Sequence, residues 1–101
     1  DWKDYTDDLA IPEDWVDNTW HNNELPSFIV NGYHIWINSP RAEERKENYT
    51  SNGWSPDDYE DWRFEVQAYN EEDGEIIYPE ANELLTLDFD EVVRFVSKPR
   101  V

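Results

Sequence analysis

The sequence predicts an α+β domain in which a small antiparallel sheet of about four strands packs against one C-terminal helix. Three observations support this prediction: an Asn31-Gly32 dipeptide between two apolar runs, an alternating run over residues 62–69, and a capped amphipathic segment over residues 88–98. A chain of 101 residues has the length of one domain of common size, so we expect a single domain over residues 1–101.

The composition is poor in aliphatic residues and rich in aromatic ones. Leu, Ile, Val and Phe together come close to the roughly 20% share below which a highly charged chain is expected to remain disordered. Aromatic residues make up 16% of the chain and favour folding, because each ring can bury on the order of 150–250 Å². We therefore expect a folded domain with a thin, aromatic-rich core.

Residues 1–24 are acidic, contain Lys3 as their one basic residue, and include several aromatic side chains. No helical or alternating period runs through this segment. We expect an irregular acidic arm with a turn near Pro12, held to the core by its aromatic side chains.

Residues 27–37 predict a β-hairpin. Asn31 and Gly32 suit the positive φ angles of a type I′ turn, and this turn pairs Val30 with Tyr33. Alternation along the two strands then separates two faces. The expected core face contains Phe28, Val30, Tyr33, Ile35 and Ile37, and the second, mixed face contains Ile29, His34 and Trp36.

Residues 38–61 are polar and form a loop of unusual length for a compact domain. Ser39 and Pro40 are suited to the start of a short exposed helix within it. Residues 48–50 match a glycosylation sequon, a three-residue pattern that is frequent by chance.

Residues 62–78 predict a second hairpin, with a five-residue loop between its strands. The first strand alternates apolar and polar side chains, so one of its faces belongs to the core. Ile76 and Tyr78 of the return strand are expected on that core face. Their neighbours there would be Ala68 and Val66.

Residues 88–98 predict the helix. Asp88 is a suitable N-cap, and Glu91 completes a capping-box pattern. The apolar stripe at helical spacing consists of Phe89, Val92, Val93 and Val96. Because β-branched residues have low helix propensity, we expect packing on the sheet to hold this helix.

Several kinds of site lack the residues that they require. The chain has no cysteine and three glycines, so disulfides, thiolate metal sites and phosphate-binding glycine loops are not expected. His21 and His34 are not accompanied by a nucleophile motif, so we expect no enzymatic activity and no cofactor. Acidic residues 57–61 and 71–73 lack the spacing of a calcium loop, so no metal site is predicted.

Trp36, Trp54 and Tyr69 are candidates for a carbohydrate-stacking platform, but a thin core also needs such rings as filler. No apolar run approaches the roughly 18 residues of a membrane span, and no signal sequence is visible. The absence of cysteine fits a reducing compartment. We therefore expect a cytoplasmic protein without membrane binding.

The charge constrains the kind of partner. The chain carries 25 acidic and 8 basic side chains, a net charge of −17. Direct nucleic-acid binding is not expected, because neutralising phosphates requires clustered Lys and Arg. Duplex DNA carries one charge per roughly 1.7 Å, so this charge equals that of roughly 29 Å of duplex, about the size of the domain. Solubility alone needs a net charge of only about 2–8.

The leading interpretation is a DNA mimic that inhibits or regulates a basic nucleic-acid-binding protein. In charge and size alone the chain is comparable with small acidic phage and plasmid proteins that inhibit restriction, glycosylase or CRISPR enzymes. Two alternatives remain. One is a strongly solvated, salt-adapted surface, and the other is an accessory domain that binds a protein through Ile29, His34 and Trp36.

The expected partner-binding surface combines carboxylates with aromatic rings, because arginine can stack on a ring while it pairs with a carboxylate. Two segments have this composition, residues 7–17 and residues 57–61. The candidate partner-binding residues are Asp7, Asp8, Glu13, Asp14, Trp15, Asp17, Asp57, Asp58, Tyr59, Glu60 and Asp61.

Overall fold

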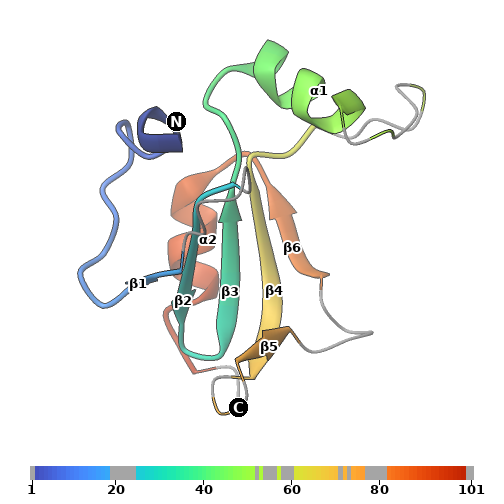
Figure 1. Cartoon of the computed structure of the whole chain (residues 1–101). Helices are drawn as coiled ribbons and strands as arrows, with labels where there is room; N and C mark the ends of the chain where they lie inside the picture. Colours follow the sequence, from blue (N-terminus) through green and yellow to red (C-terminus); the bar gives the residue numbers. More distant parts are fainter. Residues whose placement is uncertain are drawn as a thin grey trace.

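A computed structural model of the chain describes residues 2–18, 25–51, 53, 57, 61–70, 72, 74–76 and 82–99. In chain order the elements are the 3-10 helix η1 (Trp2–Tyr5), β1 (Val16–Asp17), β2 (Ser27–Val30), β3 (Tyr33–Ile37), α1 (Ala42–Ser51), β4 (Phe64–Asn70), β5 (Glu75–Ile76), β6 (Asn82–Thr86) and α2 (Phe89–Phe95). Figure 1 shows α2 behind the sheet, against one of its faces, and α1 beyond one end of the strands. The predicted α+β class is confirmed.

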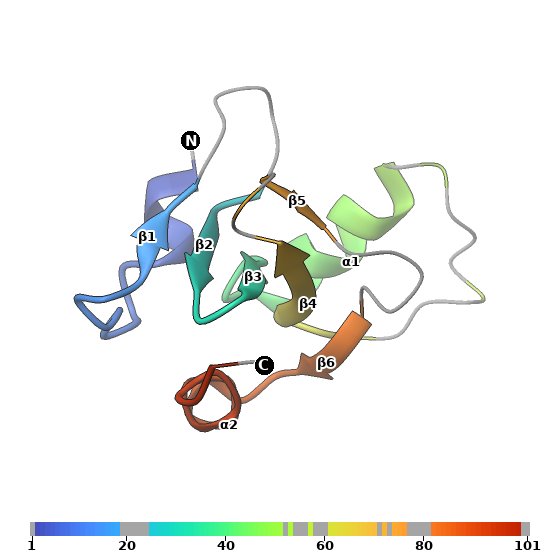
Figure 2. The same cartoon turned by 90° about the horizontal axis from the view of Figure 1, so that it is seen from below.

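The strands pair antiparallel throughout, and the main sheet has five strands rather than about four. Its order is β1-β2-β3-β4-β6, and the two-residue strand β5 pairs with the C-terminal end of β4. The sheet is therefore centred on β3 and β4, with short strands at its edges. Seen from below, α2 lies on one side of this sheet (Figure 2).

The first hairpin has the predicted register. Phe28 pairs with Ile35, and Val30 pairs with Tyr33. Asn31 and Gly32 have φ angles of 53° and 83°, as the type I′ turn requires. The expected division of the hairpin into a core face and a mixed face is therefore correct.

The second hairpin differs from the prediction in register and length. Tyr69 pairs with Ile76, one position away from the expected pairing through Ala68, and β5 ends directly after this pair. Val66 pairs with Leu84 of β6 instead of with the return strand. Leu84 packs against the core from that position, which gives β6 an apolar anchor beside β4. Tyr78 lies outside the described residues.

The core lies between α2 and the sheet face that turns toward it. Its buried members are Trp15, Val30, Tyr33, Ile35, Ile37, Phe64, Val66, Val92 and Val96. Phe89 and Val93 pack against this cluster, so the predicted stripe of α2 faces the sheet. The Asp88 side chain accepts a hydrogen bond from the backbone N–H of Asp90, which confirms the N-cap.

The predicted capping box is only half formed. Glu91 does not reach back to Asp88; it accepts a hydrogen bond from the Thr86 hydroxyl. The same hydroxyl accepts the backbone N–H of Asp88. Thr86, at the end of β6, therefore links the last strand to the start of α2.

The acidic arm is anchored by two aromatic side chains, as expected. Trp15 is buried in the core beneath the first hairpin, and Tyr5 is 3% exposed. The backbone N–H of Trp15 donates to the carbonyl of Pro12, which closes the expected turn. Residues 16–17 then pair with β2 and add one short strand to the edge of the sheet.

A second anchor for the arm is the side chain of Arg63, which is 8% exposed. Its guanidinium donates to both carboxylate oxygens of Asp8, at 2.6 and 2.8 Å. It also donates to the backbone carbonyl oxygens of Tyr5, at 2.8 Å, and Asn38, at 3.3 Å. All three nitrogens of this buried cation therefore have acceptors.

Helix α1 is held by a second buried arginine. The sequence predicts an exposed helix here, but the Arg45 side chain of α1 is buried, with 8% exposure. It donates to both carboxylate oxygens of Asp61, at 2.7 and 3.0 Å. It also donates to the carbonyl of Ser39, at 3.1 Å. The helix lacks an apolar face of its own, so this bidentate pair replaces a hydrophobic contact.

A chain of hydrogen bonds connects α1 with the arm. The Tyr5 hydroxyl donates to Glu44, at 2.7 Å, and accepts from the amide of Asn48, at 3.2 Å. The same amide donates to Asn38, at 3.1 Å, so the asparagine of the sequon is engaged inside the fold. We refer below to Tyr5, Asp8, Asn38, Arg45, Asn48, Asp61 and Arg63 together as the polar layer.

The polar layer predicts an unequal effect of two neighbouring substitutions. Asp8→Asn leaves the buried Arg63 cation without its counter-ion, and should lower the free energy of unfolding by about 1–3 kcal/mol. Asp7→Asn removes a carboxylate that is exposed like Asp8 but forms no ion pair among the described residues, and should change it by less than about 0.5 kcal/mol. Urea denaturation of both variants measures the difference. An equal effect of the two substitutions would contradict the structural role of Asp8.

Candidate functional site

The acidic arm presents part of the predicted partner-binding surface. Asp7, Glu13, Asp14 and Asp17 are exposed, the last of them on the edge strand β1. The two remaining candidates of this segment have structural roles. Asp8 binds Arg63, which lowers the pKa of its carboxyl group, and the Trp15 ring contacts other core rings.

The burial of Trp15 corrects its assignment as a stacking surface. The side chain is 7% exposed, and its ring centroid lies 6.0 Å from that of Phe28 and 5.5 Å from that of Phe89. Tyr5, the other described aromatic side chain of the arm, is buried as well. The described part of the arm therefore offers carboxylates to a partner, while its two described rings are buried.

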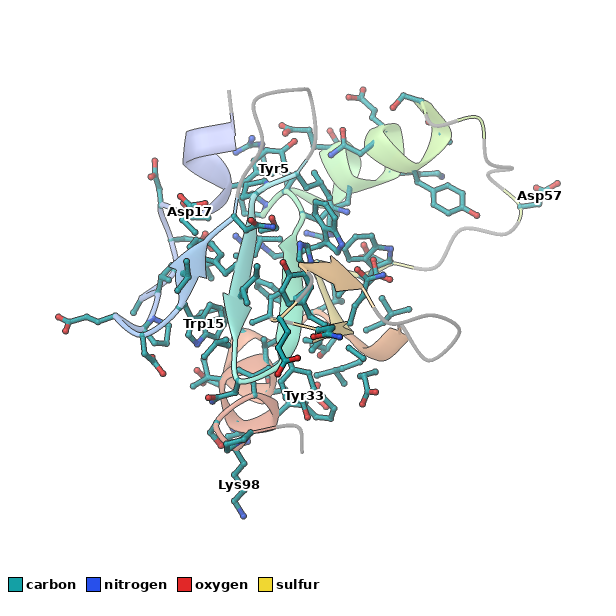
Figure 3. All side chains as sticks on the ribbon, turned by 60° about the horizontal axis from the view of Figure 1, so that its bottom comes forward. Tyr5, Trp15, Asp17, Tyr33, Asp57 and Lys98 are labelled. Carbon is teal, nitrogen blue, oxygen red and sulfur yellow. The ribbon has the colours of Figure 1, made fainter. Side chains whose placement is uncertain are left out.

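The second predicted group does not join the first. Asp58, Tyr59 and Glu60 lie outside the described residues, and Asp61 binds Arg45 in the polar layer. Asp57 is exposed. Figure 3 shows Asp57 and Asp17 at opposite sides of the molecule, so these two acids do not belong to one contiguous patch.

Three of the described arginines form ion pairs with carboxylates of the same chain. Arg45 and Arg63 bind carboxylates in the polar layer, and Arg41 binds Glu44, at 2.7 Å, and Asp4, at 2.9 Å. The hydrogen bond from Arg41, followed by that from the Tyr5 hydroxyl, lowers the pKa of Glu44 to about 2. These three arginines pair with four of the chain's carboxylates, so the ion pairs do not change the net charge of −17, and the other acids remain in large excess over bases.

The sheet face opposite α2, which we call the second face, carries a group of aromatic and polar side chains. The strand registers place one row across it through Val16, Ile29, His34 and Gln67, and another through Trp36, Glu65 and Leu85. Val16 is 64% exposed and Leu85 is 44% exposed. The edge strands β1 and β6 therefore extend the mixed face that the sequence predicts for the first hairpin.

The orientation of Trp36 on the second face is fixed by its neighbours. Its indole N–H donates to the Gln67 side-chain oxygen, at 2.7 Å. The His34 ring lies 4.6 Å from the Trp36 ring and 5.6 Å from the Tyr69 ring, centroid to centroid. Trp36 and Tyr69 are half-buried, so parts of both rings remain accessible.

His34 is buried within this ring cluster. It is 3% exposed, and its Nδ1 atom has no hydrogen-bond partner in the described part of the chain. Burial lowers the pKa of His34 to about 4. The imidazole is therefore neutral at pH 7, and it brings no positive charge to the second face.

Glu65 is a half-buried carboxylate on the same face. It is the direct cross-strand neighbour of Trp36 on one side and of Leu85 on the other. Burial raises the pKa of its carboxyl group. No described residue donates a hydrogen bond to this carboxylate or forms an ion pair with it, so the cost of its burial is not offset.

Neither a metal site nor a membrane span is found in the described ranges. No three His, Asp or Glu side chains there are grouped so that they could hold a metal ion. No helix among the same residues is long and apolar enough to cross a membrane. Comparisons of the chain with protein-family models, with curated proteins and with solved structures give no significant match.

The uncompensated burial of Glu65 predicts a gain in stability from Glu65→Gln. The pKa of Glu65 in the folded state lies above its ordinary value of 4.5, so the folded protein loses stability as the pH rises from about 4.5 through the raised pKa. The variant lacks this loss, and its Tm at pH 7 should exceed that of the original protein by about 2–5 °C.

Thermal unfolding between pH 4.5 and pH 8 measures this gain. His34 acts with the opposite sign, because stability falls as the pH drops from 6.5 toward about 4, so the two proteins are compared at equal pH. Glu47→Gln removes one exposed charge from α1 and serves as the control. A lower Tm of Glu65→Gln at pH 7 would show that the carboxylate has a stabilising partner.

Proposed function

We propose that this chain is a non-enzymatic, cytoplasmic interaction protein that binds a basic nucleic-acid-binding protein as a mimic of DNA. The observation that carries the proposal is the net charge of −17, which the ion pairs of Arg41, Arg45 and Arg63 with the chain's own carboxylates do not reduce. The fold thus retains a large excess of acidic side chains at its surface, and such a surface attracts a cationic groove.

The density of charge supports the comparison with DNA. A net charge of −17 equals that of roughly 29 Å of duplex. The longest principal extent of the molecule is 36 Å, and its radius of gyration is 13.4 Å. The protein therefore carries nearly as much charge per unit length as the ligand that it would replace in the partner's groove.

The arm is the most suitable surface for this contact. Asp7, Glu13 and Asp14 are exposed and take part in none of the ion pairs between described residues. Asp8 and Asp61 are excluded, because the buried arginines require them. Repulsion among these acids disfavours folding, and binding to a basic groove would relieve it.

A triple variant tests the proposal. Asp7→Asn, Glu13→Gln and Asp14→Asn together remove three charges at nearly constant shape. They should weaken binding to the partner about tenfold or more near physiological salt, and reduce the salt dependence of binding. The partner is captured on the immobilised protein, identified, and its affinity is measured by calorimetry as a function of salt.

The matched control removes three exposed charges elsewhere, through Glu43→Gln, Glu47→Gln and Glu72→Gln. It should weaken binding less than the arm variant. Competition with duplex DNA tests the mechanism, because a mimic and DNA cannot occupy one groove together. If the captured partner binds DNA and this protein simultaneously, each with undiminished affinity, mimicry is refuted.

A second candidate function is an accessory protein-binding domain that uses the mixed face of the first hairpin, formed by Ile29, His34 and Trp36. The exposure of Val16 and Leu85 on the same face favours this candidate, because they widen its apolar area. Binding dominated by apolar burial would be nearly independent of salt, whereas binding of a DNA mimic falls steeply as salt rises.

A further inference from the structure

The second face carries a fixed aromatic ring beside a carboxylate that has no counter-ion among the described residues. Trp36 and Glu65 are direct cross-strand neighbours, so their Cβ atoms are roughly 4.5–5.5 Å apart and both side chains project from the same side of the sheet. Helix α2 packs against the opposite face and does not cover them. The pair is therefore placed so that one ligand group can touch both.

The counter-ion of Glu65 does not come from the described arginines. Arg41, Arg45 and Arg63 bind other carboxylates, and Arg94 belongs to α2, on the other side of the sheet. A half-buried carboxylate without a partner destabilises the fold, and an external cation would offset that cost. The basic partner required by the proposed function supplies such cations.

We propose that Trp36 and Glu65 form a binding position for an arginine side chain of the basic partner. The guanidinium stacks on the indole ring and donates two parallel hydrogen bonds to the carboxylate. This inference rests on the proposed function and adds a specific anchor to it, since the described aromatic side chains of the arm, Tyr5 and Trp15, are buried.

Arginine fits this position better than lysine. A planar guanidinium can stack and pair at the same time, whereas an ammonium group is a compact, strongly hydrated point charge. The indole is already oriented by its hydrogen bond to Gln67, so little side-chain freedom is lost on binding. The neighbouring His34 is neutral at pH 7 and does not repel the incoming cation.

The test uses N-acetyl-arginine amide as the probe and N-acetyl-lysine amide as its matched control, each titrated into the folded chain at pH 7. Two-dimensional NMR follows the indole N–H signals of the 6 tryptophans, and Trp36→Phe identifies the signal of Trp36. The arginine probe should shift the Trp36 signal in a saturable manner. The lysine probe should bind at least fivefold more weakly.

Two charge variants locate the carboxylate. Glu65→Gln should weaken the arginine probe at least fivefold, whereas Glu47→Gln, which removes one exposed charge from α1, should change its affinity less than twofold. Equal affinities for the arginine and lysine probes, or shifts confined to other indoles, would overturn the proposed position. Full affinity of Glu65→Gln for arginine would overturn it as well.

The captured partner separates this inference from the proposed function. If Glu65→Gln and Trp36→Phe bind the partner as the original chain does, while the arm variant does not, the arginine position is wrong and mimicry stands. If binding depends on Trp36 and Glu65 but not on the arm, and DNA does not compete, mimicry is wrong and the arginine position stands.

Discussion

The buried guanidinium of Arg63 joins the start of the acidic arm to the end of the first hairpin, in addition to the apolar contact that Trp15 supplies. It binds Asp8 and the Tyr5 carbonyl in the arm, and the Asn38 carbonyl at the end of the first hairpin. Arg45 plays the same role for α1, because it donates to the Asp61 carboxylate and to the Ser39 carbonyl. In a chain with 25 acids and 8 bases, burying two arginines is costly unless each guanidinium nitrogen has an acceptor. The polar layer meets that condition, and it holds α1, a helix without an apolar face, against the rest of the fold.

The elements that the sequence predicts correctly are those governed by local rules. The Asn31-Gly32 turn fixes the register of the first hairpin, because two-residue turns leave no freedom to slip. The sequence does not predict the edge strands β1 and β6. Strand β1 has two residues, too few to show an alternating pattern. In β6, the irregularity in its pairing with β4 lies at Glu83, because Val66 pairs with Leu84 and Gln67 with Asn82. The adjacent leucines Leu84 and Leu85 lie on opposite faces of the sheet, so the sequence does not show the alternation typical of a half-buried strand.

The candidate site was predictable only where burial could be inferred from alternation. The mixed face of Ile29, His34 and Trp36 follows from the hairpin register, and the structure places Glu65 directly beside Trp36. The structural roles of Asp8 and Asp61 do not follow, because each binds an arginine brought close by the tertiary fold, 55 and 16 residues away in sequence. An acidic residue in an acidic segment gives no local sign of such a partner.

The hydrogen bond between the Asn31 side chain and the Val96 carbonyl has a consequence for the order of assembly. It spans 65 positions in sequence and measures 2.7 Å. The turn that contains Asn31 forms through contacts between residues close in sequence, whereas the docking of α2 requires contacts between residues far apart in sequence. A turn that forms locally thus offers its Asn31 amide as a docking point for the C-cap residue of α2, Val96.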